Sequence, residues 1–292
     1  MTTKSYEAGR RTLVTELERV PPGVDPNVPS SARVYDYLLG GKDHLAIDRA
    51  VAEKLLAVAP DSRLVARANR RFQVEAVRHL AVQGIRQFID LGTGIPTSPS
   101  IHEVVREVHP ACRVIYVDYD PVVRMHAQVL LADSPGVEGV QADLRRPEEI
   151  LADPHVTGLI DFDQPVCVLM VGVLHFVMDE EDPAGIVAAF RKRMVPGSHL
   201  VLSHAMAESA PEAIAQLTMA TAGSPAQGRF RSHDEVLTLF DGFELIGPGL
   251  VPVQDWHIDA DDAAIPLLDR PPQLRIDGGV GRLSAGSPPY SP

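Results

Sequence analysis

The stretch FIDLGTGIPTSPS, residues 88–100, joins a short apolar run to a turn that contains Gly92 and Gly94. The apolar run predicts a buried β-strand. Two glycines directly after it predict a tight turn that a ligand can approach closely, because neither residue carries a Cβ. A helical pattern begins at residue 100, so the stretch predicts a strand, a ligand-binding turn and a helix in succession.

The same alternation of short apolar runs and longer amphipathic segments continues from residue 85 onward. We expect strands at 85–91, 112–118, 137–144, 165–172 and 197–205, and a broken pair of strands at 243–253. Strands that are separated by helices of this length need crossover connections. The pattern therefore predicts an α/β fold with a mainly parallel sheet that is covered on both faces.

The chain divides into four predicted parts. Residues 1–30 contain a short helix and a proline-rich linker, and residues 31–83 contain helical segments that form a cap. Residues 84–270 form the α/β domain. Residues 271–292, which are rich in Pro, Gly and Ser, form a C-terminal tail.

The charge of the chain bears on its partners. Its 292 residues have a formal net charge of -12. Neutralising nucleic-acid phosphates needs clustered Lys and Arg, so we expect no nucleic-acid partner and a small-molecule substrate instead. No apolar stretch approaches the roughly 18 residues that a membrane span needs, which predicts a soluble, cytoplasmic protein.

Cysteine and histidine usage gives no sign of a metal site. Cys112 and Cys167 each lie inside an apolar run, which is typical of buried free thiols in a reducing compartment. The histidines are scattered over different predicted elements and lack zinc-ligand spacing. The oligomeric state is left open by the sequence.

The glycine turn indicates which cofactor the sheet binds. In open α/β sheets the ligand lies beyond the carboxyl ends of the strands. A dinucleotide site uses a third glycine to bring the pyrophosphate to the helix, but Thr97 stands at that position here. The order acid-x-Gly-x-Gly, from Asp90 to Gly94, is a common opening of S-adenosylmethionine sites, where no phosphate needs a cradle.

Carboxylates stand at the carboxyl ends of the next two predicted strands. Asp118 can accept hydrogen bonds from both hydroxyls of a ribose, which NAD and S-adenosylmethionine share. Asp143 can accept from an adenine amino group while the Leu144 amide donates to the ring. The alternative for Asp143 is a helix-capping role, and a cap is the preferred interpretation of Asp120.

His175 follows the fourth predicted strand, next to the position of a transferred methyl group. It can orient or deprotonate a nucleophile, because its ordinary pKa is near neutral. Equally, it can be a wall residue that shapes the pocket. Methyl transfer depends mainly on in-line positioning of the acceptor, so a base is optional.

Over residues 24–283 the chain resembles the class I S-adenosylmethionine-dependent methyltransferases, and within them an actinobacterial family first catalogued as a domain of unknown function. The motifs that carry the resemblance are SARVYDYLLGGKDHLAIDR (31–49), ARANRRF (66–72), FIDLGTGIPTSPSIHEV (88–104), VIYVDYDPVV (114–123), VQADLRRPEEIL (140–151), VLHFV (173–177) and GSHLVLSHA (197–205). The resemblance implies a Rossmann-like seven-stranded sheet whose last strand is antiparallel, with an N-terminal helical cap over the site.

The resemblance also implies the cofactor contacts. These are Asn69 and Arg70 at the carboxylate, Asp90, Gly92 and Gly94 at the methionine end, Asp118 at the ribose, Asp143 with Leu144 at the adenine, and Val171 at the sulfonium, with Thr93 and Tyr119 as further cofactor-binding residues. Arg70 can instead belong to a solvated helix face. The third glycine of the class motif is Pro96 here, which makes the loop stiffer.

Three functions remain in competition at this point. The first is a methyltransferase that acts on a small molecule. The second is a non-catalytic S-adenosylmethionine-binding protein, because fold and cofactor site do not establish turnover. The third is an NAD-dependent oxidoreductase, which Asp118 permits and which Thr97 and Asp143 oppose. The segment YDYLLGGKD, residues 35–43, is either a lid over the acceptor or a core anchor of the cap.

Overall fold

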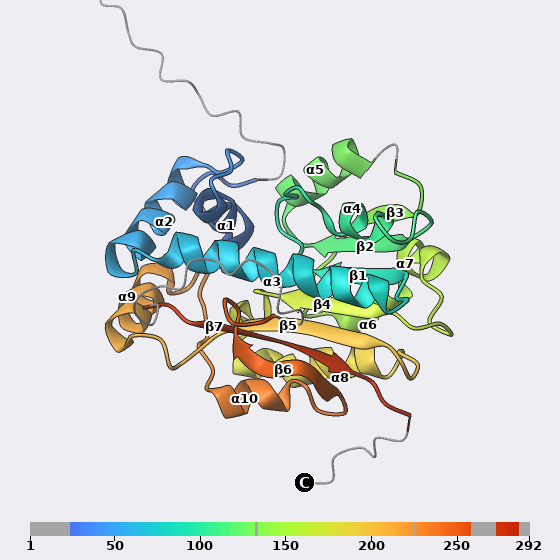
Figure 1. Cartoon of the computed structure of the whole chain (residues 1–292). Helices are drawn as coiled ribbons and strands as arrows, with labels where there is room; N and C mark the ends of the chain where they lie inside the picture. Colours follow the sequence, from blue (N-terminus) through green and yellow to red (C-terminus); the bar gives the residue numbers. More distant parts are fainter. Residues whose placement is uncertain (1–23, 132–133, 225, 258–272, 286–292) are drawn as a thin grey trace, which may run out of the picture.

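The computed structural model describes residues 24–131, 134–224, 226–257 and 273–285, so the helix expected near the N-terminus lies outside the described residues. Seven strands form one sheet in the order β3-β2-β1-β4-β5-β7-β6 (Figure 1). Their bounds are β1 Gln87–Leu91, β2 Arg113–Asp118, β3 Val137–Gln141, β4 Cys167–Val171, β5 His199–Ala205, β6 Glu244–Pro252 and β7 Ile276–Arg282.

The pairing of the strands confirms the predicted fold. The pairs β1·β2, β1·β4, β2·β3 and β4·β5 are all parallel, and β7 runs antiparallel to both of its neighbours, β5 and β6. Parallel neighbours need crossovers, which the helices between the strands provide. The molecule therefore has the Rossmann-like seven-stranded sheet with an antiparallel last strand.

Two expectations about the C-terminal part are wrong. Strand β7 lies within residues 271–292, which were expected to form a tail, so the α/β domain extends beyond residue 270. The expected pair of strands at 243–253 is a single strand, β6 Glu244–Pro252, with an irregular register between Ile246 and Val251. The glycines of β7 lie where neighbouring aromatic side chains leave no room for a Cβ. A Cβ on Gly278 would lie 2.9 Å from Phe72, and a Cβ on Gly281 would lie 2.8 Å from Phe243.

Helices cover both faces of the sheet (Figure 1). Apolar side chains of α3 and α4 pack on one face, and those of α6, α7, α8 and α10 pack on the other. The bounds are α3 Ser62–Val82, α4 Ile101–Arg106, α5 Pro121–Leu131, α6 Pro147–Ala152, α7 Pro154–Leu159, α8 Pro183–Arg191 and α10 His233–Thr238, with short 3-10 helices at Leu174–Phe176 and Asp179–Glu181.

Within the predicted cap, residues 31–83, α1 Ser31–Leu39 and α2 Ala46–Val58 lie against the first half of α3, whereas α3 itself packs its apolar side chains on the sheet. Helix α9, Pro211–Thr221, is far from α2 in the sequence but packs against it. A separate apolar cluster joins these elements, and it includes Leu38, Leu55, Ala66, Ala213 and Leu274. The cap thus has its own small core above the carboxyl ends of the strands.

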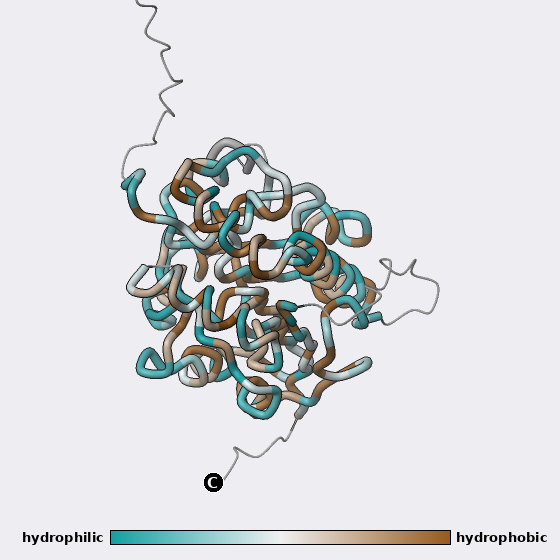
Figure 2. The backbone as a smooth tube through the Cα atoms, turned by 90° about the vertical axis from the view of Figure 1, so that its left-hand side faces the viewer, coloured by the Kyte–Doolittle hydropathy of each residue, from teal (hydrophilic) through white to brown (hydrophobic). Residues whose placement is uncertain are grey.

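In the described part of the chain, no helix combines the length and apolar character that a membrane crossing requires. Hydrophobic and hydrophilic segments alternate along the chain (Figure 2). Cys112 and Cys167 are buried free thiols, as the sequence predicts.

Candidate functional site

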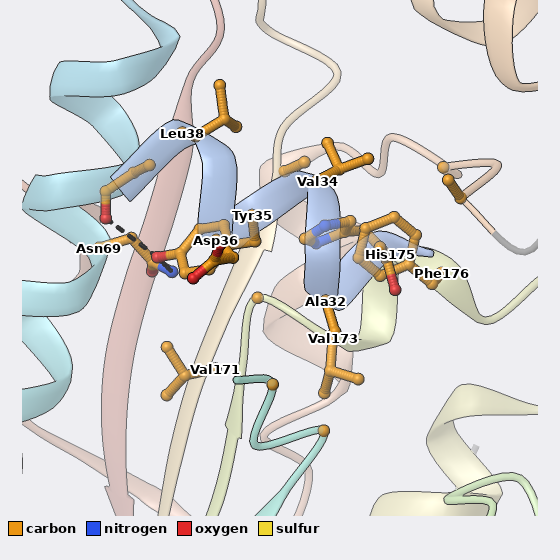
Figure 3. Close-up of a pocket in the computed structure, with 18 of the residues that line it drawn as sticks. Ala32, Val34, Tyr35, Asp36, Leu38, Asn69, Val171, Val173, His175 and Phe176 are labelled. Carbon is orange, nitrogen blue, oxygen red and sulfur yellow. Dashed lines mark hydrogen bonds between the residues drawn. The ribbon is translucent and has the colours of Figure 1, made fainter. Parts of the chain in front are cut away.

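One continuous cavity lies between the carboxyl ends of the strands and the helical cap. At one end it is lined by the glycine turn after β1, by Asp118 at the end of β2 and by Leu144 beyond β3. At the other end it is lined by side chains of α1, α2, α3 and α9. Figure 3 shows α1 crossing above Val171 and Val173, which lie at the end of β4 between the two parts.

The glycine turn has the geometry that the sequence predicts. Gly92 and Gly94 have φ values of +68° and +65°, a region that residues with a Cβ rarely adopt. A Cβ on Gly92 would lie 2.3 Å from Val173 Cγ2, whereas one on Gly94 would meet no atom within 4 Å. The backbone at Gly94 is therefore open on the side where a side chain would stand.

Asp118 is buried and lines the cavity. Its Oδ2 accepts a hydrogen bond from the Gly94 amide at 2.8 Å, and its Oδ1 accepts from the Asp120 amide at 2.9 Å. Burial raises the pKa of Asp118 to about 6, although these two bonds act to lower it. Each carboxylate oxygen keeps acceptor capacity for a ligand hydroxyl.

Asp90 lies under the turn and lines a smaller neighbouring cavity rather than the main one. Its Oδ2 accepts from the Thr93 hydroxyl at 2.6 Å, so Asp90 acts on the main cavity through Thr93. Burial raises the pKa of Asp90 to about 6. Thr93, which lines both cavities, is thus placed between this carboxylate and the ligand space.

Arg70 reaches from α3 to the loop that follows the turn. Its Nη2 donates to the carbonyls of Thr97 at 2.9 Å and Pro99 at 2.5 Å. Its Nε is buried and has no hydrogen-bond partner among the described residues. Arg70 lines the cavity, so it is not the solvated helix face that was one of its two interpretations.

The segment after β3 is only partly turned toward the cavity. Leu144 lines the cavity, as does Tyr119 after β2, but Asp143 is absent from its lining. The carboxylate of Asp143 accepts from Arg145 Nη2 at 2.6 Å, and Arg145 also pairs with Glu181 at 2.9 Å. Partial burial acts to raise the pKa of Asp143, but the bonds from Arg145 hold it below its usual value. Asp143 also accepts from the Arg145 amide, as a local capping residue does.

Asp120 has the capping role that the sequence predicts. Its Oδ1 accepts from the Val122 amide at 2.8 Å, in the first turn of α5. Its Oδ2 accepts from the Ser30 hydroxyl and pairs with Arg33 Nη1 at 3.3 Å. The residue therefore also ties the cap to the end of β2.

His175 lines the middle of the cavity, in the 3-10 turn after β4. Figure 3 shows its ring beside Phe176, and the two ring centres are 4.3 Å apart. Its Nδ1 is buried without a hydrogen-bond partner among the described residues. Burial, with smaller contributions from His204 and Arg231, holds the pKa of His175 well below its usual value. The imidazole is therefore neutral near pH 7 and can accept a hydrogen bond.

Arg231 fixes the turn that carries His175, and no sequence pattern pointed to this residue. Its guanidinium donates to the carbonyls of Leu174 at 3.1 Å and Val177 at 2.9 Å. It also donates to Asp179 Oδ1 at 2.7 Å. Its distance of 57 residues from Leu174 explains why a local pattern could not reveal this contact.

Tyr35 anchors α1 in the wall of the cavity. Its hydroxyl donates to the Ala66 carbonyl at 2.9 Å and accepts from Asn69 Nδ2 at 3.1 Å. Asn69 Oδ1 in turn accepts from the Ser203 hydroxyl on β5 at 2.6 Å. This chain of bonds favours the interpretation of Tyr35 as a core anchor of the cap (Figure 3).

Tyr35→Phe is expected to lower the free energy of unfolding by about 1–2 kcal/mol, because it leaves buried partners of the hydroxyl unsatisfied. Denaturant unfolding measures this change, and the affinity for S-adenosylhomocysteine should stay the same. Tyr37→Phe is the matched control, because its hydroxyl bonds to the exposed carboxylate of Glu53. Equal destabilisation by the two variants would contradict the anchoring role of Tyr35.

Comparison with known proteins identifies the family. A profile of the family described as S-adenosyl methyltransferase matches residues 18–284. The chain belongs to this family. A DUF574 family protein from Streptomyces avermitilis MA-4680 is 39% identical, with 88% of this chain and 98% of that chain covered and a TM-score of 0.82. A proposed methyltransferase from Thermobifida fusca YX is 38% identical, with 91% and 98% covered and a TM-score of 0.84. A search of curated proteins gives no match.

The family assignment decides between the three functions that the sequence left open. The chain is an S-adenosylmethionine-dependent methyltransferase of class I fold, and S-adenosylmethionine is its cofactor. The NAD-dependent alternative is not supported. The residues present fit the cofactor: Asp118 offers a buried carboxylate, the backbone at Gly94 is open, and Arg70 keeps a buried, unpartnered Nε.

Proposed function

We propose that this methyltransferase modifies a small molecule held under the helical cap. The observation that carries the proposal is the continuity of the cavity from the glycine turn to a largely apolar chamber. An acceptor in this chamber is surrounded by the cap, which suits a small molecule better than an extended polymer. The chamber is lined by Val34, Leu38, Leu39, Val51, Leu55, Leu217, Phe230 and Leu274.

The cofactor-binding roles follow from the contacts described above. Asp118 would accept hydrogen bonds from the ribose hydroxyls, and Gly92, Thr93 and Gly94 would lie along the methionine end. Arg70 would offer its free Nε to the cofactor carboxylate. The bound cofactor supplies a methyl group that its positively charged sulfur already activates.

The adenine end is expected to contact the segment around residues 119–144. Leu144 would donate its amide to the ring. A direct role for the Asp143 carboxylate would require it to exchange its bonds to Arg145 for a bond to the adenine. Val171, at the end of β4, would lie next to the sulfonium.

His175 would orient the acceptor by accepting a hydrogen bond at its unpartnered Nδ1. His175→Ala is expected to lower kcat by about tenfold, the scale of one hydrogen bond, with little change in S-adenosylhomocysteine affinity. The variant and the native chain should have the same pH dependence of kcat between pH 7 and 8, because burial holds the pKa of the His175 imidazole well below its usual value. His155→Ala, at an exposed histidine, is the control. An unchanged kcat in His175→Ala would assign His175 to the pocket wall.

Two measurements test the proposed function itself. S-adenosylhomocysteine at 100 times its Kd should stabilise the protein by about 2.7 kcal/mol, whereas NAD should not raise Tm. Methyl transfer from labelled S-adenosylmethionine is then screened against small-molecule pools and against protein and RNA. Transfer to a macromolecule alone would overturn the assignment of the acceptor.

A further inference from the structure

The part of the acceptor chamber that the described residues form contains one carboxylate, that of Asp36. Among the described residues that line the cavity, only Asp36 and Asp118 are acidic, and Asp118 lies at the cofactor end. Asp36 belongs to α1, and Leu38 of the same helix is part of the apolar wall (Figure 3). A carboxylate in such surroundings needs a positively charged partner, because burying an unpaired charge is costly.

The partners of Asp36 leave its charge uncompensated. Asp36 is 4% exposed, and its Oδ2 accepts from the Asp43 amide at 2.9 Å. Its Oδ1 accepts no bond from a described residue, and no ion pair with Asp36 forms within the described ranges. Burial and the charge of Asp43 raise its pKa, while that amide bond and the histidines His44 and His126 act to lower it. An asparagine could make the bond to Asp43 equally well, so the loop does not need the charge.

The carboxylate is also held closely in position. A Cβ on Gly41 would lie 1.9 Å from Asp36 Oδ1, although the φ of Gly41 is not positive. Gly40, with a φ of +91°, provides the left-handed end of α1 instead. Gly41 is therefore the residue that makes room for the carboxylate, and any side chain there would displace it.

We propose that Asp36 binds a protonated amine of the acceptor, so that the acceptor is an apolar small molecule carrying a basic nitrogen. This inference rests on the proposed function, because it assigns the acceptor to the same cavity. Inside the chamber an ammonium group would compensate the buried carboxylate, and the apolar walls would contact the rest of the molecule. The amine is the recognition group, and no bond to it is formed or broken by Asp36.

The test compares 4-phenylbutylamine with 4-phenylbutanol, which differ in charge but hardly in shape. Calorimetry is done on protein saturated with S-adenosylhomocysteine at neutral pH. The native chain is expected to bind the amine roughly tenfold or more tightly than the alcohol, the scale of one charge-assisted bond. Asp36→Asn should reduce this preference to less than about threefold while the alcohol binds as before.

Two further variants separate charge from folding. Gly41→Ala keeps the carboxylate but displaces it, and it should also reduce the amine preference. Asp43→Asn removes a nearby negative charge, with a side chain that is half exposed, and should keep the preference. Equal binding of amine and alcohol, binding of neither, or an amine preference that persists in Asp36→Asn would overturn the inference. Failure of the native chain to bind S-adenosylhomocysteine would instead overturn the proposed function.

Discussion

Arg33→Met is expected to lower the free energy of unfolding by about 3–5 kcal/mol, the scale of breaking a buried ion pair. Arg33 is 4% exposed, and it lies between Asp48, which is fully buried, and Asp120, which is 3% exposed. Its Nε is 2.7 Å from Asp48 Oδ2, and its Nη1 is 3.3 Å from Asp120 Oδ2. The variant would leave both carboxylates buried without their cation.

The loss should be concentrated in the cap, because Arg33 joins α1 to α2 and to the start of α5. Denaturant unfolding measures the total change, and hydrogen exchange of the α1 and α2 amides locates it. Arg146→Met is the control, since its pair with Glu149 is 67% and 68% exposed and should contribute within about 0.5 kcal/mol. A change of less than about 1 kcal/mol in Arg33→Met would show that the ion pairs are not what holds the cap.

The predictable part of the site follows from strand order. The glycine turn, Asp118, Leu144 and His175 each lie at or just after the carboxyl end of a predicted strand, and parallel strands bring these ends to one edge of the sheet. The apolar runs alone were enough to find these strands. For this reason the end of the cavity around the glycine turn could be predicted without any knowledge of distant contacts.

Strand β7 could not be predicted in this way, because its sequence IDGGVGR has the glycine content of a turn. Its glycines are explained only by the tertiary neighbours. A Cβ on Gly279 would lie 3.2 Å from Phe240, which α10 and its following turn bring against the strand. A local pattern carries no information about such crowding, so the segment was assigned to the tail.

The charged groups of the cap were missed for a related reason. Arg33 contacts Asp48 and Asp120, which are 15 and 87 residues away, and no spacing rule links them. Asp143 shows the opposite case: its partner Arg145 is two residues away and was visible in the sequence. A position after a strand identifies a candidate ligand-binding residue, but the neighbouring side chains decide whether its carboxylate is free to bind the ligand.

Asp118→Ala is expected to weaken S-adenosylhomocysteine binding by at least about 100-fold, since each charge-assisted bond lost costs about 1.5–3 kcal/mol. The variant also removes the acceptor of the Gly94 amide, so the turn loses one of its hydrogen bonds to β2 and keeps those of the Gly92 and Thr93 amides to the Val117 carbonyl. Calorimetry measures the affinity, and circular dichroism shows whether the variant is folded. Asp118→Asn keeps an acceptor oxygen, so its affinity should fall between that of the native chain and that of Asp118→Ala. Native affinity in a folded Asp118→Ala would restrict Asp118 to a structural role.

The pH dependence provides a second test of Asp118, because ligand affinity and folding stability should change with pH in opposite directions. Its pKa is about 6 in the unliganded fold, and ligand hydroxyls donate to its ionised form, so affinity should decrease as the pH falls through 6. The raised pKa means that the folded chain holds this proton more tightly than the unfolded chain. The contribution of Asp118 to stability is therefore present below pH 3.8 and lost as the pH rises toward 6. Asp118→Asn should remove this part of both trends, and an unchanged pH profile of affinity would contradict the assignment.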